Sequence, residues 1–420
     1  MSGAHGAETE THAPKRKGKV KRKHTVGRVV AVSALVLALV TALSVVFFYR
    51  HLNGNIETGS FEALGEGRPE KVYRGNGEPL NILVMGDDTR SGEDNDIDQE
   101  TGGGSDTTIL VHLSADRSRA YAVSIPRDSI VDRPECGGSS AATEVKWNAA
   151  FNVGGEICTA DQFEQTTGIR LDHYVVVDFN GFGEMVDAVG GVPVCVPEDI
   201  VDRKHQIFVP AGDPSVLSGD QALDYVRARY VGELIQQNDI SRIRRQQEFI
   251  GALIREVKSA GTLTRLDKVV NFLDAATRSL RTDEDLGSVT RIGKIALQLQ
   301  NIGLDNVKFV TVPTEYFPMD SEFRGSVFWT PEADTLWKLI NEDKPLPPSV
   351  LNGAVSAEPP STSSEAQGGG SASPSPSGSA SPSETTSPSE TASPSETAST
   401  PESPSDTATD EAEPIPGVCA

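Results

Sequence analysis

Five arginines and no lysine occur within the stretch YVRARYVGELIQQNDISRIRRQQ, residues 225–247. They are Arg227, Arg229, Arg242, Arg244 and Arg245. An arginine side chain is a planar fork of hydrogen-bond donors that stays charged, so it suits bidentate binding of phosphate or carboxylate. The whole chain has a formal net charge of −22, which makes this cationic cluster stand out. Two interpretations stay open on this stretch alone: an anion-binding site, or a solvated helix face paired with nearby acids.

Two aspartates and two further arginines stand where apolar runs end or begin. Asp88 follows the run PLNILVMGD, and Asp106 begins DTTILVHLSAD. If these runs are neighbouring strands, the two carboxylates can share a hard cation such as Mg²⁺, although each aspartate could instead simply cap a turn. Arg90 and Arg127 also lie at strand ends, where ligands of α/β sheets usually bind.

Apolar runs of strand length predict the elements that position these residues. They cover 79–88, 106–116, 119–128, 173–179, 191–197 and 307–313. Helical periodicity dominates 241–258, and 180–191 looks helical and stops at a glycine pair. The rest of 261–300 is expected to form helices that pack on the same domain. Strands that alternate with helices predict a layered α/β domain.

A short helix should precede the first two arginines of the cluster. Ser218 is followed three residues later by Gln221, which is a capping-box pattern. Arg227 and Arg229 are two residues apart, so in an extended segment after this helix both would point to the same side.

A second helix should carry the other arginines. Arg242 and Gln246 are four residues apart, which places them on one face of a helix that begins near Asp239 or Ser241. The first turn of a helix also carries a partial positive charge. Two elements can therefore aim forked cations and a helix N-terminus at one place, as the binding of a polyanion requires.

The N-terminal end of the 420-residue chain looks non-globular. Residues 1–28 are polar and basic, and residues 29–49 contain no charged residue. As a helix, 29–49 would span about 31 Å, close to the hydrocarbon thickness of a bilayer. It is too long for the apolar core of a cleavable signal peptide, so it is predicted to be an uncleaved transmembrane helix. The basic segment before it then lies in the cytoplasm, and everything after it lies outside the cell.

Composition divides the remaining chain into three parts. Residues 50–77 are expected to be an extracellular linker, 78–347 a globular domain, and 348–420 a disordered tail rich in Ser, Pro, Thr and Glu. The tail contains the repeat SPSETT-SPSETA-SPSETA across 381–398. Such a segment has too little apolar surface to offset the entropy of ordering it, so it is interpreted as a spacer or a glycan-bearing stalk.

Four cysteines occur, Cys136, Cys158, Cys195 and Cys419. An extracellular location permits disulfides. A Cys136–Cys158 bridge is favoured because both lie in Gly-rich loop segments, whereas Cys195 lies in an apolar strand run, but the sequence leaves the pairing open. Cys-x-x-Cys and His/Cys metal spacings are absent, so no zinc site is expected.

Several motifs, taken in order, resemble those of the LytR-CpsA-Psr (LCP) family. They are NILVMGDDTR…GGGSDTTILVHLS, AVSIPRDS, KWNAAFNVGG, HYVVVDFNGFGEMVDAVGGVPV and LSGDQALDYVRARY…DISRIRRQQ. The similarity covers roughly residues 78–258 and extends to about 345. It implies a three-layer α/β/α domain with a central mixed sheet and an apolar groove for a polyprenyl chain.

The resemblance also implies an activity. LCP proteins are membrane-anchored phosphotransferases that take a glycopolymer from a polyprenyl-pyrophosphate carrier. They join it by a phosphodiester to a peptidoglycan sugar hydroxyl and release polyprenyl phosphate. A pyrophosphatase acting on the same carrier and a non-catalytic module that binds lipid-linked glycan stay open as alternatives. The acidic composition and the extracellular location argue against a nucleic-acid partner.

Site residues follow from the matched motifs. Asp88 and Asp106 match the aspartates that hold Mg²⁺, with Mn²⁺ as an alternative metal. The residues that match the pyrophosphate site are Arg90, Arg127, Arg227, Arg229, Arg242 and Gln246. Asp239 matches an acid that helps to activate the acceptor hydroxyl or a water, and Arg127 and Arg227 are assigned to catalysis with it. Residues 230–241 lack the glycine-rich loop usual in the family, which bears on the placement of Asp239.

Overall fold

A computed structural model describes residues 23–64, 67–73, 75–87, 104–203, 206–228 and 238–358. Within these residues the central element is an eight-stranded mixed sheet. Its strands, in spatial order, are β1 (Glu57–Gly59), β12 (Leu280–Asp283), β7 (His173–Asp178), β2 (Leu80–Asp87), β3 (Ser105–Leu113), β4 (Ala120–Ile125), β13 (Val307–Thr311) and β16 (Val355–Ser356). Strands β2, β3 and β4 form an antiparallel meander, whereas β7 lies parallel to β2 and β13 lies parallel to β4.

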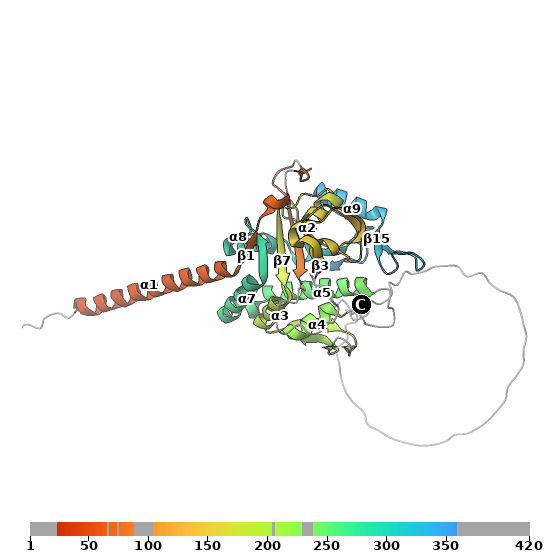
Figure 1. Cartoon of the computed structure of the whole chain (residues 1–420). Coiled ribbons are helices and arrows are strands. Elements are labelled where there is room, and N and C mark those ends of the chain that lie inside the picture. Colours follow the sequence, from red (N-terminus) through yellow and green to blue (C-terminus); the bar gives the residue numbers. More distant parts are fainter. Residues whose placement is uncertain are drawn as a thin grey trace, which may run out of the picture.

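Helices cover both faces of this sheet because its central strands are apolar on both sides. Leu83 and Met85 of β2 join a core cluster with α2 (Ala149–Thr167) and α9 (Pro331–Asn341). The alternate residue Val84 packs in a cluster with Ile250 and Ile254 of α5 (Asn238–Lys258). Figure 1 shows α2 and α9 on one side of the sheet and α5 on the other. The prediction of a three-layer α/β/α domain with a mixed sheet is confirmed.

A smaller unit is attached to α5. Its elements are α3 (Phe179–Val189), β8 (Val192–Val196), β9 (Ile200–Asp202), β10 (Ile207–Val209), β11 (Gly212–Leu217) and α4 (Gly219–Arg227). Val194, Leu217 and Tyr225 bury their side chains in a separate cluster that includes Phe249 of α5. The predicted capping box at the start of α4 is present.

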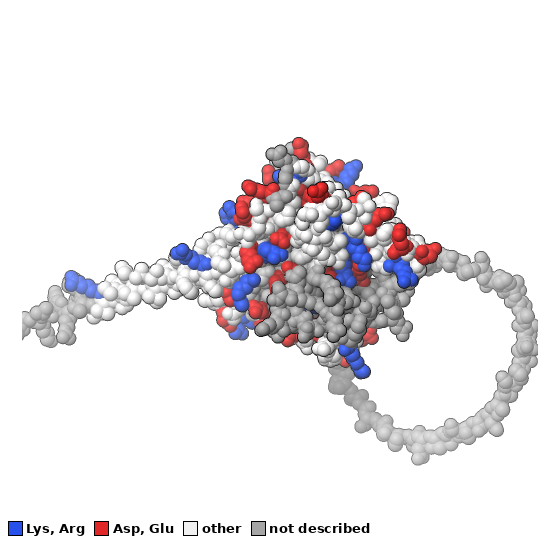
Figure 2. Space-filling view, in the orientation of Figure 1, with Lys and Arg blue, Asp and Glu red and all other residues white. Residues whose placement is uncertain are grey.

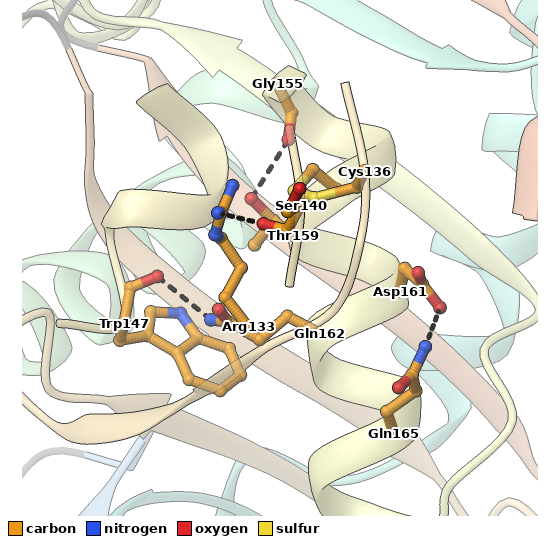
Figure 3. Close-up of a disulfide and its surroundings, with 10 residues drawn as sticks. Arg133, Cys136, Ser140, Trp147, Gly155, Thr159, Asp161, Gln162 and Gln165 are labelled. Carbon is orange, nitrogen blue, oxygen red and sulfur yellow. Dashed lines mark hydrogen bonds between the residues drawn. A yellow bond between two sulfur atoms is a disulfide. The ribbon is translucent and has the colours of Figure 1, made fainter. Parts of the chain in front are cut away.

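Two hairpins and a disulfide complete the fold around α2. Strands β5 (Ile130–Arg133) and β6 (Ala142–Lys146) form one hairpin, and β14 (Thr314–Tyr316) and β15 (Val327–Trp329) form the other. The favoured bridge is confirmed: Cys136, in the turn between β5 and β6, is joined to Cys158 of α2, with their Cα atoms 5.4 Å apart. Figure 3 shows this disulfide beside the Arg133 guanidinium, which donates to the Ser140 carbonyl. Cys195 is disulfide-bonded as well.

The long helix α1 (Lys23–Asn55) is apolar enough to cross a membrane, and its side chains from 26 to 47 are exposed. Figure 2 shows this helix as a largely uncharged rod outside the domain. Its C-terminal end and the residues after it are folded onto the domain, in contrast to the linker expected at 50–77. Leu52 and Ile56 are buried, β1 pairs with β12, and the short helix η1 (Phe61–Leu64) packs against α2. Apolar residues are few and irregularly spaced in this segment, so its sequence shows no helical or strand periodicity from which the packing could be predicted.

The remaining helices lie on the α5 side or in connections. They are α6 (Ala260–Leu263), α7 (Leu266–Ser279), α8 (Val289–Asn301) and η3 (Leu304–Asn306). Strand β12 lies between α7 and α8, where only helices were expected. At the other end, β16 pairs with β13 beyond residue 347, so part of the segment expected to be tail belongs to the sheet. The predicted basic segment before residue 23 and the chain after residue 358 lie outside the described residues.

Candidate active site

Asp106 and Arg127 meet because their strands are neighbours. The end of β2 lies against the start of β3, with Asp87 opposite Ser105, so the prediction that these two strand ends meet is confirmed. Asp106 is the second residue of β3, and Arg127 follows the end of the adjacent strand β4. Arg127 Nη1 donates to Asp106 Oδ1 at 2.5 Å.

The first turn of α5 brings a second acid and a second arginine to the same place. Arg242 is 1% exposed, and its Nη2 donates to Asp239 Oδ1 at 2.5 Å and to the Asp106 carbonyl at 3.2 Å. Its Nη1 lies 3.4 Å from Asp106 Oδ2. Arg127 Nε lies 3.7 Å from Asp239 Oδ1. Asp106, Arg127, Asp239 and Arg242, here called the charged cluster, therefore form one connected set.

The carboxylates of the charged cluster stabilise the charged form of Arg127. Burial disfavours the charged form of Arg127, but the carboxylates of Asp106, Asp239 and Asp128 outweigh it and raise the pKa of Arg127. Asp128 is in turn paired with Lys146, whose Nζ lies 2.6 Å from Asp128 Oδ1. Each arginine is thus held in place by carboxylates while its fork carries a full positive charge, which suits it to bracing an anionic ligand.

One carboxylate oxygen in the charged cluster, Asp239 Oδ2, has no hydrogen-bond partner among the described residues. Asp239 Oδ1 accepts from Arg242, whereas Asp239 Oδ2 is buried and has no hydrogen-bond partner among the described residues. Buried polar atoms are nearly always paired, so an orphaned carboxylate oxygen is a place where a ligand's donor or a cation is expected.

Arg227, on α4, lies over an aromatic ring that packs against the sheet. It occupies the last turn of this helix, and its guanidinium carbon lies 4.9 Å from the centre of the Phe179 ring. Phe179 in turn packs on Gly86, where a Cβ would lie 3.1 Å from the ring. Gly86 is opposite Thr107 of β3, the residue after Asp106. One aromatic ring therefore separates Arg227 from the strand ends that hold the cluster.

Three further described residues of the arginine-rich stretch, Arg244, Arg245 and Gln246, donate to backbone carbonyls. Arg245 is fully buried and donates to the carbonyls of Tyr225 and Ala228 at the end of α4, and burial lowers its pKa to about 10. Gln246 donates to the Val226 carbonyl at 3.2 Å. Arg244 donates to the carbonyl of Gly353, near the end of the described chain. The solvated-face interpretation fits only Arg244 among these residues, whose Nε lies 3.7 Å from Glu248 Oε1, and it does not fit the buried Arg245. The anion-binding interpretation stays a prediction.

Three predicted residues lie outside the described residues, namely Asp88, Arg90 and Arg229. Conversely, Asp128, Lys146 and Tyr316 adjoin the charged cluster without having been singled out. Burial, with the nearby carboxylates of Asp239 and Asp128, raises the pKa of Tyr316 to about 12. Asp128 directly follows Arg127 and could have been suspected for that reason, but Tyr316 is far away in the sequence and carries no local signal.

An apolar cavity of about 860 Å³ lies at the other end of α5. Among the residues that line it are Leu253, Val257, Phe272, Leu297 and Tyr49, which come from α5, α7, α8 and the end of α1. Leu253 is eleven residues beyond Arg242 on α5, so helix geometry places about 16 Å between the cavity and the charged cluster.

The described residues contain no group of three or more His, Cys, Asp or Glu side chains that could hold a metal ion. Asp106 is the described member of the predicted metal pair, and an arginine contacts each of its oxygens. A carboxylate can still accept further contacts on its remaining lone pairs, and the orphaned Asp239 Oδ2 is a second oxygen of the type that Mg²⁺ prefers. The donor set present is thus compatible with a hard divalent cation.

Comparison with known proteins agrees with these features. The sequence model of the LytR-CpsA-Psr family matches residues 48–345. The chain belongs to the LytR-CpsA-Psr family. Its LytR-CpsA-Psr region thus begins in the last part of α1 and includes the charged cluster, the cavity and both hairpins.

Named relatives come from bacteria. The chain is 31% identical over 306 residues to "Cell wall biosynthesis protein LcpA" of Corynebacterium glutamicum, covering 66% of this chain and 56% of LcpA. It is 29% identical over 324 residues to "Polyisoprenyl-teichoic acid--peptidoglycan teichoic acid transferase TagV" of Bacillus subtilis, covering 74% of this chain and 76% of TagV. The chain thus spans little more than half the length of LcpA.

Solved structures share the LytR-CpsA-Psr fold. Protein gbs0355 from Streptococcus agalactiae superposes with a TM-score of 0.51 at 23% identity, covering 64% of this chain and 90% of that one. At this level of identity the likeness establishes the fold alone.

Proposed function

We propose that this protein is a membrane-anchored extracellular phosphotransferase. Its donor is a glycopolymer on a polyprenyl-pyrophosphate carrier, and its acceptor is a sugar hydroxyl of peptidoglycan. The observation that carries this proposal is the charged cluster, in which Arg127 and Arg242 converge from separate elements on Asp106 and Asp239. The transferase name of the relative TagV supports the choice of donor and acceptor.

The reaction needs little covalent chemistry from the protein. The acceptor oxygen attacks the phosphorus that bears the glycopolymer, and a new P–O bond forms. The bond from that phosphorus to the bridging oxygen breaks, and polyprenyl phosphate leaves with the electron pair. Such transfers are accelerated mainly by positioning and by stabilising charge, which is the role assigned to Arg127, Arg242 and Arg227.

Asp239 is assigned to the acceptor. Arg242 holds its Oδ1, so the second oxygen is left oriented and without a partner among the described residues. An acceptor hydroxyl that donates to Oδ2 would be held in line and would pass its proton to this carboxylate as the new bond forms.

A divalent cation is assigned to Asp106, together with Asp88 outside the described residues. When bound, Mg²⁺ or Mn²⁺ neutralises charge on phosphate oxygens. Arginines contact both oxygens of Asp106, so this carboxylate also orients the two guanidinium groups.

The apolar cavity is assigned to the polyprenyl chain. It adjoins the end of α1, and we infer that α1 is the membrane anchor with its N-terminus in the cytoplasm. A carrier whose diphosphate reaches the charged cluster would have its isoprene units along α5 and its tail at the membrane side of the domain.

The decisive experiment uses the full-length protein with a labelled polyprenyl-pyrophosphate glycan and soluble wall oligomers. The expected product is a new phosphodiester between polymer and acceptor, lost in Arg127→Ala and on addition of EDTA. The control Arg265→Ala removes an exposed arginine paired with Asp267, away from the charged cluster, and should retain activity.

Each alternative predicts a different result. Release of polymer phosphate without the acceptor product would identify a pyrophosphatase that uses the same residues. Donor binding that persists in Asp106→Ala, with no turnover in any variant, would identify a binding module. Full transfer by Arg127→Ala would contradict the assignment of the charged cluster.

A further inference from the structure

The hairpin β14–β15 is fastened directly to the segment that carries the catalytic arginine. The Val327 amide donates to the Asp128 carbonyl at 3.1 Å, and Trp329 Nε1 donates to Ser129 Oγ at 3.1 Å. Val327 also forms an isolated bridge with Ser129. Because these bonds begin one residue after Arg127, the hairpin and the charged cluster hold a fixed geometry.

Tyr316 is the hairpin residue that faces this attachment. In the antiparallel register it lies directly opposite Val327, the residue bonded to Asp128. Tyr316 is 37% exposed, so part of its ring is in contact with solvent. The carboxylates of Asp239 and Asp128 are near enough to contribute to the raised pKa of its phenol. The ring therefore lies near Asp239, whose Oδ2 has no hydrogen-bond partner among the described residues.

The loop of the hairpin is stiffened from within. Phe317 lies 5.1 Å, centroid to centroid, from both Phe323 and Phe328, with the rings tilted or edge-on. Aromatic pairs in these arrangements stabilise each other beyond their buried area. The backbone on either side of Tyr316 is therefore held in place without the Tyr316 ring.

Charge and position distinguish this hairpin from the donor side of the site. Residues 314–329 contain three acids, Glu315, Asp320 and Glu322, and one base, Arg324. A net negative surface does not attract a polyanionic donor, but it accepts hydrogen bonds from an uncharged polyol. The apolar cavity includes Tyr49 of α1, whereas Figure 1 shows β15 on the side of the domain away from α1.

We propose that the exposed edge of hairpin β14–β15 around Tyr316 binds the acceptor saccharide. The ligand is an uncharged pyranose, whose apolar C–H face packs on the Tyr316 ring while a hydroxyl donates to Asp239 Oδ2. This inference rests on the proposed transferase function and adds where its second substrate binds. Donor and acceptor then approach from opposite ends of the site, the donor from the anchor side and the acceptor from the side facing the wall.

The test separates acceptor binding from donor binding in the full-length protein. Tyr316→Ala should raise the acceptor KM for wall saccharide oligomers by about tenfold, the size expected for one aromatic contact, and leave the donor KM unchanged. Tyr316→Phe and Tyr316→Trp should stay within about twofold of the wild type because they keep a ring. The control Phe208→Ala removes an exposed aromatic side chain from β10 and should change neither KM.

A readout without donor keeps this inference independent of the transfer reaction. Saturation-transfer NMR with the same oligomers should show contacts to the wild type and to Tyr316→Trp that are lost in Tyr316→Ala. If the wild type binds oligomers in this way but transfers nothing, the proposed function fails and the saccharide site stands. An acceptor KM and NMR signal that are unchanged in correctly folded Tyr316→Ala would overturn the site. If Tyr316→Ala does not fold, the test uses Tyr316→Phe and Tyr316→Trp. A site that depends on an aromatic ring requires both variants to bind the oligomers, and loss of binding in either folded variant would overturn it.

Discussion

Arg242 joins two elements through one buried side chain. It bonds the first turn of its own helix through Asp239 and the start of β3 through Asp106. The pair of carboxylates that it separates would otherwise repel each other in a site with little water. Arg242 therefore contributes to the fold as well as to the proposed chemistry.

Replacing Arg242 by Ala should lower the free energy of unfolding by about 3 kcal/mol, because removal of one partner leaves buried charge uncompensated. Arg242→Lys keeps the charge but loses the fork, so it should fall between the Ala variant and the wild type. Urea unfolding at neutral pH measures both, and transfer activity should be absent in both. A loss of less than about 1 kcal/mol in the Ala variant would show that the carboxylates do not depend on this guanidinium.

Ionisation of Tyr174 should lower the free energy of unfolding of the domain at alkaline pH. Burial, with the nearby carboxylates of Glu156 and Asp283, raises its pKa from 10.0 to about 12. The folded state thus holds the phenol proton more tightly than the unfolded chain, so this contribution is complete below pH 10 and is lost as the pH rises through about 12.

The expected loss is about 2–3 kcal/mol for a shift of this size. Unfolding free energies of the wild type should therefore decline across the alkaline range, and Tyr174→Phe should give a flatter profile. Tyr225 and Tyr316 also have raised pKa values, so the decline should be reduced in Tyr174→Phe but not abolished. If the unfolding free energies of the wild type and Tyr174→Phe fall in parallel as the pH rises, groups other than Tyr174 cause the alkaline loss of stability.

At the scale of elements, Arg227 depends on how closely α4 packs on α3. Gly219, the first residue of α4, lies against the Gly183 carbonyl of α3, and a Cβ at this position would overlap that oxygen and lie 2.8 Å from Asp187 Oδ2. The Gly219 amide donates to Asp187 Oδ1 at 2.8 Å. A side chain here would push α4 outward and carry Arg227 away from the Phe179 ring.

Gly219→Ala should therefore destabilise the domain by about 1–3 kcal/mol, as overpacking does. It should also reduce transfer several-fold at temperatures where the variant is still fully folded, as judged by circular dichroism. The control Gly54→Ala places a methyl group on α1 where nothing lies within 4 Å, and it should leave both properties unchanged. Wild-type activity in folded Gly219→Ala would mean that Arg227 tolerates a shift of its helix.

Elements with strong local patterns were predicted from the sequence. The apolar runs of β2, β3 and β4 and the Ser218 capping box gave correct elements because neighbouring residues determine them. Strand β12 was missed because its four residues follow α7 directly and include Arg281 and Asp283, so no apolar run marks it. The hairpin β14–β15 was missed for a similar reason, since its strands have three residues each.

In the candidate active site, too, local sequence patterns predicted some features, whereas others depend on the tertiary fold. That Asp106 and Arg127 stand at strand ends is visible in the sequence, but their contact requires the order of β3 and β4 in the sheet. Likewise, no local pattern separates Arg242, which faces the carboxylates, from Arg245, which fixes the end of α4. The difference is set by which side of α5 meets which neighbour, and that is a property of the tertiary fold.

For the whole molecule, the outer end of α1 is part of the domain. His51 Nε2 lies 2.8 Å from Asp274 Oδ1 of α7, and Asn55 Nδ2 donates to the same oxygen at 3.2 Å. Asn53 Oδ1 accepts from the Val289 amide at the start of α8 at 3.1 Å. If α1 spans the membrane, these bonds fix how the domain stands on it, with the apolar cavity beside the point where the chain leaves the bilayer.

Asp274→Ala should loosen this attachment because one carboxylate oxygen serves both His51 and Asn55. In reconstituted membranes, transfer from a long-chain, membrane-embedded donor should fall several-fold, since the cavity no longer stays beside the lipid surface. Transfer from a short-chain, water-soluble donor should not change, because that donor reaches the cavity from solution. The control Asp267→Ala removes an exposed acid from the same helix and should affect neither donor. Equal losses with both donors would assign Asp274 to the stability of the domain, and no loss with either would show that a fixed orientation on the membrane is not needed.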